Sequence, residues 1–164
     1  MQQNNIPPTT LPTFHSFNAT MTARLSAAFI IQSFPALQPF NQDVANLLYP
    51  ELVFFMDSII HHVDLPYSIS FSALCLLHRL RVYLVGWSNH ELFFIAFIVA
   101  LKILCDNSHS NQEWSEFICG LFTHKEINEM ERAFCHYMRW NFAIGHINLH
   151  NFTMYVWTEF NTFV

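Results

Sequence analysis

Glycine is scarce in this sequence, with only 3 residues among 164. Loops that cradle phosphates and the elbow that carries a hydrolase nucleophile need closely spaced glycines, because the backbone there turns sharply or approaches a ligand. The sequence contains neither motif, and no pair of carboxylates is spaced for acid–base chemistry. We therefore expect no enzyme activity and no cofactor.

Charged residues are also few, at 12% of the chain against about 25% in ordinary domains. Only 7 residues are Lys or Arg and the net charge is −5. This argues against a nucleic-acid partner, because such proteins need a basic surface. Hydrophobic residues make up 52%, including 18 Phe. They fill a large core or leave an apolar patch exposed for a partner, and both can hold.

Metal-site spacings are missing as well. The ten His are scattered without an HExxH pattern, and the four cysteines form no CxxC pair, so we expect no metal. Each cysteine falls within an expected helix beside apolar residues, which predicts reduced core thiols of an intracellular protein. They are Cys75, Cys105, Cys119 and Cys135. The N-terminal residues show neither the basic stretch nor the apolar core of a secretory signal.

No apolar run is long enough for a membrane span. The run from Leu92 to Leu101 has ten residues, where a span needs about 18 or more. The mean hydropathy of +0.24 leaves a membrane-bound helical protein as an alternative, which the short run and Lys102 oppose.

Ser88 and Glu91 form a capping box before the run. A short helix that is apolar on every side belongs at the centre of a bundle. We expect an all-α fold around this helix, at about residues 89–106.

The other helices are predicted from capping boxes and helix breakers. Ser110 with Glu113, and Thr123 with Glu126, open two helices, the second reaching about Trp140. Further helices are expected at 18–34, 50–63, 68–85 and 148–160, with Pro50 in a first position, Gly86 after an end and Asn148 as a cap. Residues 1–17 are rich in Gln, Asn, Pro and Thr, which predicts a disordered tail.

Two charged residues do not fit this pattern. On a helical wheel Glu131 lies about 40° from Ile127, inside the apolar face of its helix. Lys102 is the only charge in the central helix after Glu91. An unpaired buried charge is costly, so we expect the two residues to meet each other or polar groups of a partner. The alternatives are an ion pair that only joins two helices, and a lysine that snorkels near a helix end.

A series of motifs follows one another from about residue 45 to 145. The motifs are Leu77-His78-Arg79-Leu80, Ala100-Leu101-Lys102, Asp106, Asn111 to Trp114, Asn128-Glu129-Met130-Glu131, Phe134 and Trp140. In order and spacing this series resembles a cyclin box, and the resemblance is best to the single-box fungal cyclins of phosphate and nutrient signalling. The resemblance implies a cyclin fold, a five-helix bundle flanked by N- and C-terminal helices.

The resemblance also implies a partner. Lys102 and Glu131 match the pair with which cyclins hydrogen-bond the backbone of a cyclin-dependent kinase, in a heterodimer. An apolar contact around this pair would involve Ile103, Cys135, Trp140 and Phe142. Where the family often has an acidic residue before the Trp, this chain has Arg139, so no substrate-docking feature is carried over. The alternative is a cyclin-fold module without a kinase, like the repeats of general transcription factors, which are basic and usually doubled.

The domain organisation implied by the resemblance has four parts. They are a tail at 1–17, an N-terminal helix and connector at 18–44, a single cyclin box at 45–145 and a C-terminal helical segment at 146–164. The remainder is too short for a second box. The family further implies a regulator of protein kinase in nutrient signalling or the cell cycle, located in the nucleus, the cytoplasm or both.

Overall fold

The computed structural model describes residues 17–34 and 42–163. These residues form seven α-helices and one short 3-10 helix, with no strand among them, which confirms the all-α prediction. The helices are α1 (Ala19–Ser33), α2 (Gln42–Val63), α3 (Ser68–Leu80), α4 (Asn89–Leu104), α5 (Asn111–Phe117), α6 (His124–Tyr137) and α7 (His146–Phe160), and the 3-10 helix is Asn161–Phe163. The predicted tail up to residue 16 and most of the predicted connector, 35–41, lie outside the described residues.

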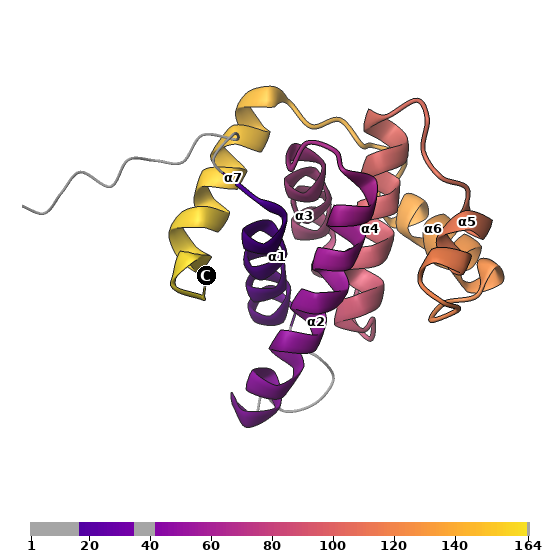
Figure 1. The fold of residues 1–164 in the computed structure, drawn as a ribbon. Helices are drawn as coiled ribbons and strands as arrows, with labels where there is room; N and C mark the ends of the chain where they lie inside the picture. Colours follow the sequence, from indigo (N-terminus) through magenta and orange to yellow (C-terminus); the bar gives the residue numbers. More distant parts are fainter. Residues whose placement is uncertain (1–16, 35–41, 164) are drawn as a thin grey trace, which may run out of the picture.

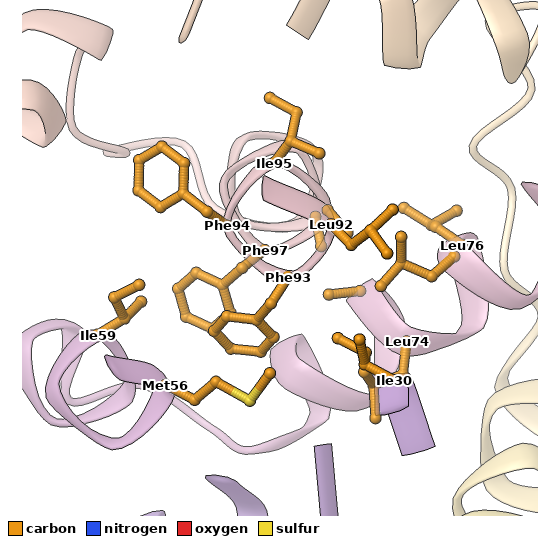
Figure 2. Packing of buried hydrophobic residues seen from close by; sticks show 14 of the residues in the cluster. Ile30, Met56, Ile59, Leu74, Leu76, Leu92, Phe93, Phe94, Ile95 and Phe97 are labelled. Atoms are coloured by element: carbon orange, nitrogen blue, oxygen red, sulfur yellow. The ribbon is translucent and has the colours of Figure 1, made fainter. Parts of the chain in front are cut away.

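Helix α4 is the centre of the bundle, as its sequence predicts. Every side chain from Leu92 to Leu101 is buried, with at most 3% of its surface exposed. Phe93 and Phe97 face Met56 of α2, while Leu92 lies beside α3 (Figure 2). Helices α5 and α6 lie on one side of α4, and α7 lies on the opposite side of the bundle, beyond α1 (Figure 1). Because α4 has no polar face to turn outward, its neighbours must surround it.

All three predicted capping boxes are formed, at the starts of α4, α5 and α6. At α5 the backbone N–H of Ser110 donates to Glu113 Oε2 over 2.7 Å, and the N–H of Glu113 donates to Ser110 Oγ over 3.3 Å. Each box uses a polar side chain to satisfy backbone N–H groups that lack a partner inside the helix. The start of α5 is therefore set by local chemistry.

Several predicted helix limits are wrong. Helix α2 begins at Gln42 and continues through Pro50, whose ring stands on an exposed side of the helix. Helix α3 ends at Leu80 instead of residue 85, and Gly86, with φ +96°, lies in the loop that follows. Helix α7 begins at His146 with Gly145 as its cap, so Asn148 is not the cap. In each case the single breaker or cap residue does not set the helix limit that the sequence predicted.

Two further expectations are corrected by burial. Phe17, predicted to belong to the tail, is buried edge-on against Phe71 and Trp157, at ring-centre distances of 5.0 and 5.8 Å. Cys119 is exposed in a turn after α5, with φ +53°, and is no core thiol. The other three cysteines are buried or half-buried, and all four are free thiols. In the described part of the chain, no helix combines the length and the apolar character that crossing a bilayer requires.

Candidate partner-binding site

Lys102 and Glu131 meet at the surface between α4 and α6. Lys102 lies in the last turn of α4, where the helix leaves the core, and Glu131 lies in the middle of α6. The Lys102 Nζ atom is 2.7 Å from Glu131 Oε1. This confirms that the two misplaced charges pair with each other. Their side chains remain 28% and 24% exposed, so the pair is desolvated in part but still within reach of a partner.

Asn111, the first residue of α5, bridges the two charges. Lys102 Nζ donates to Asn111 Oδ1 over 2.7 Å, and Asn111 Nδ2 donates to Glu131 Oε2 over 2.6 Å. Asn111 is buried, with 8% of its surface exposed. Its place is set by the capping box of Ser110, the residue before it. The site is thus built from three helices, where the charge pattern predicted only two.

Asn128 completes the polar cluster from one turn earlier on α6. Its Oδ1 accepts a hydrogen bond of 2.7 Å from Asn111 Nδ2, and its Nδ2 lies 3.0 Å from His124 Nε2. No role for Asn111 or Asn128 is predicted from the sequence. The available signal was their position, because they open the Asn-x-x-Trp and Asn-x-Met-Glu motifs that carry the family resemblance.

A pocket of about 310 Å³ lies next to the pair on α6. Its walls are Asn128, Glu131, Arg132, Cys135 and Trp140. Burial raises the pKa of the Cys135 thiol, the charge of Glu131 raises it further, and Lys102 lowers it in part. Cys135 is therefore an uncharged, apolar wall near neutral pH. The pocket brings together four residues named from the sequence or its motifs: Asn128, Glu131, Cys135 and Trp140.

Trp140 is held away from the core by the backbone. Arg139 and Trp140 have φ values of +49° and +58°, a left-handed conformation that is uncommon for residues other than glycine. The Trp140 N–H donates to the Cys135 carbonyl over 3.2 Å, which closes the turn after α6. As a result 72% of the Trp140 surface is exposed. Strained backbone conformations cluster at functional sites, and here the strained residues hold a large apolar side chain toward solvent.

Phe142 and Ile103 lie at the margins of the site. The Phe142 ring stands perpendicular to Trp140 at 6.3 Å and packs in part against the core. Ile103 follows Lys102 directly and is 43% exposed, and the next residue, Leu104, is 53% exposed. Leu104 is an apolar surface residue that the sequence did not single out.

The chemistry of this site is suited to binding. Within the described residues, no three His, Cys, Asp or Glu side chains are placed to hold a metal ion. Lys102 has three donors, of which Asn111 and Glu131 accept two among the described residues. The site therefore offers a charged pair with spare hydrogen-bonding capacity beside exposed apolar side chains.

Comparison with known proteins gives a family match. The cyclin family model matches residues 3–144. The chain is 30% identical to PHO85 cyclin-2 of Saccharomyces cerevisiae over 102 residues, which are 58% of this chain and 33% of that protein. It is 24% identical to PHO85 cyclin-9 over 110 residues (63% and 36%) and 26% identical to PHO85 cyclin-1 over 102 residues (58% and 37%), both of the same yeast. The chain thus matches about a third of the length of these relatives. No solved structure matches it.

Proposed function

This chain belongs to the cyclin family, and we propose that it is a regulatory subunit that binds and activates a cyclin-dependent protein kinase. The family match covers most of the chain, and all three relatives are cyclins by name. The proposed role is that of a binding subunit, in a heterodimer in which the kinase does the chemistry.

The paired charges at the surface of α4 and α6 carry this proposal. Lys102 and Glu131 are bonded to each other and to Asn111, yet about a quarter of each side chain stays exposed. The remaining donor of Lys102 suits a backbone carbonyl of a partner, and the remaining lone pairs of Glu131 suit backbone N–H groups. Trp140, Ile103 and Cys135 would supply the apolar contact around them, with Phe142 behind Trp140.

Activation follows from differential affinity. A kinase is active only when its regulatory C-helix is turned inward, so that the conserved lysine–glutamate pair of the kinase forms. A cyclin that binds this conformation more tightly than the inactive one shifts the equilibrium toward it. Apolar contact supplies most of the affinity, and the charged pair fixes the orientation of the two proteins.

The relatives suggest which kinase to test first. They are named as PHO85 cyclins, and this shared name gives the first kinase to test. A kinase of this type, acting in phosphate or nutrient signalling, is the proposed partner. We place the complex inside the cell, in the nucleus, the cytoplasm or both.

Reversing the charges one at a time tests the proposal. Lys102→Glu and Glu131→Lys each place like charges 2.7 Å apart at the site, so each should abolish pull-down of the kinase and its activation after co-expression. Lys125→Glu is the matched control, because Lys125 lies on the same helix as Glu131 and its side chain is 86% exposed. It should bind normally.

Each outcome of this experiment has a clear meaning. Circular dichroism checks that every variant is folded. A folded wild-type chain that binds no kinase of the panel contradicts the proposal and favours a cyclin-fold module without a kinase. If the wild type binds and both charge-reversed variants bind equally well, the site is wrong although the function is right.

A further inference from the structure

The direction of every hydrogen bond around the charged pair is set by Lys102. An ammonium group can only donate, so the Asn111 atom that faces it at 2.7 Å must be Oδ1. The Nδ2 of Asn111 therefore faces Glu131 Oε2 at 2.6 Å and Asn128 Oδ1 at 2.7 Å. Both hydrogens of this amide are used. Neither amide can turn over without placing two donors or two acceptors against each other.

Asn111 differs from the two charged residues in side-chain length and in burial. Lys102 and Glu131 have long side chains that are 28% and 24% exposed, and one direct contact joins them. Asn111 has a short side chain, is 8% exposed, and is attached to the capped first turn of α5. It holds the lysine with its carbonyl and the glutamate with its amide. A site whose long side chains are already oriented loses less freedom when it binds.

From this geometry we propose that Asn111 and Asn128 are positioning residues for kinase binding. Asn111 orients Lys102 and Glu131 together, and Asn128 keeps the Asn111 amide directed toward Glu131. The inference rests on the proposed function of the charged pair and extends it to α5. The capping box that starts this helix of seven residues makes Asn111 its first residue, which places the bridging side chain at the site.

Changing each asparagine to an aspartate of nearly equal size tests whether the site needs the amide donor of Asn111 or only the acceptor of Asn128. Asn128→Asp keeps the acceptor that Asn111 requires, and should leave kinase affinity within about twofold of wild type. Asn111→Asp replaces the amide donor with a carboxylate that faces Glu131 Oε2 and Asn128 Oδ1. Losing a hydrogen bond to a charged group and adding repulsion should weaken kinase binding about tenfold or more.

Measuring kinase affinity as a function of pH distinguishes a positioning role from a general loss of stability. The affinity of Asn111→Asp, divided by that of wild type at the same pH, should recover as the pH falls. Protonation of the new carboxyl group restores a donor toward Glu131. The same ratio for Asn128→Asp should stay near one. Affinities are measured by calorimetry with the full chain and the kinase, and circular dichroism checks folding.

The results separate this inference from the proposed function. If the wild type binds the kinase and Asn111→Asp binds equally well, the positioning role is wrong although the function stands. A folded wild type that binds no kinase overturns both. If Asn111→Asp does not fold, Asn128→Leu decides. It removes the acceptor, so it should weaken binding where Asn128→Asp does not, and equal behaviour of these two variants overturns the proposal.

Discussion

Trp140 is a large apolar side chain that the bundle leaves exposed at the site. It is 72% exposed and held outward by two consecutive residues with positive φ. Aromatic side chains are the commonest anchors of protein interfaces. Its position beside Glu131 in the same pocket wall makes it the apolar counterpart of the charged pair.

Trp140→Ala should therefore separate binding from stability. We expect the melting temperature to stay close to that of wild type, because the side chain buries little surface in the free chain. Kinase affinity should fall more than about tenfold, the loss typical of an anchor residue. Ile147→Ala, at a 74% exposed position on α7, is the matched control and should change neither quantity. A large drop in melting temperature for Trp140→Ala would mean that the ring supports the fold.

At the scale of elements, the capping boxes connect local chemistry to the site. The box at α5 lies directly before Asn111 and positions it. The similar box at α6 begins at Thr123, five residues before Asn128, and is not adjacent to a residue that bridges the two charges. Backbone hydrogen bonds lower the pKa of Glu113 and Glu126 in these two boxes. Both carboxyls thus stabilise the folded chain above their unfolded pKa, and this stabilisation is lost as the pH falls through the lower folded value.

Ser110→Ala and Thr123→Ala should differ in their effect on binding. Each removes one capping hydroxyl, and each should lower the free energy of unfolding by about 1 kcal/mol. Only Ser110→Ala loosens the first turn of α5 and with it the bridge through Asn111, so only this variant should also bind the kinase more weakly than its stability loss accounts for. Thermal melts and calorimetric affinities measure the two effects. Equal affinities would show that the cap and the bridge are independent.

At the scale of the whole molecule, His78 and His90 are two of the three described histidines whose pKa is lowered by burial, and such groups connect stability to pH. Burial lowers the pKa of His78, which lies among Phe29, Phe152 and Tyr155 where α7 covers α3. Burial also lowers the pKa of His90, packed 4.9 Å from Phe55, while Glu51 opposes the shift. Both groups take up a proton more readily in the unfolded chain, so stability falls once the pH drops below their ordinary value of 6.5.

The melting temperature should accordingly be lower at pH 5.5 than at pH 7.5, since this interval spans the ordinary histidine pKa of about 6.5. His78→Phe removes one of the two groups and should make this decline shallower. His150→Phe, at an exposed position on α7, serves as the comparison. Differential scanning fluorimetry from pH 7.5 to pH 5.5 measures how steeply the melting temperature of each variant falls. A melting temperature that rises as the pH is lowered would contradict the lowered pKa of these histidines.

The sequence by itself determined where three helices begin, which helix is central and which two charges are out of place on apolar faces. These features depend on short-range chemistry or on one helix alone. A capping box needs only residues three positions apart, and a helix without a polar face has to be enclosed. The cost of an unpaired buried charge predicted that Lys102 and Glu131 meet each other or polar groups of a partner, and the structure shows that they meet each other.

Only the tertiary structure decided the ends of the helices and the bridge at the site. Helix α3 stops at Leu80, the last buried position before three exposed residues, and α7 starts at His146 with Gly145 as its cap. Asn111 lies 9 residues from Lys102 and 20 from Glu131 along the chain, and no periodicity relates such positions. Their contact exists because α4, α5 and α6 converge at one point, and that convergence results from packing around α4.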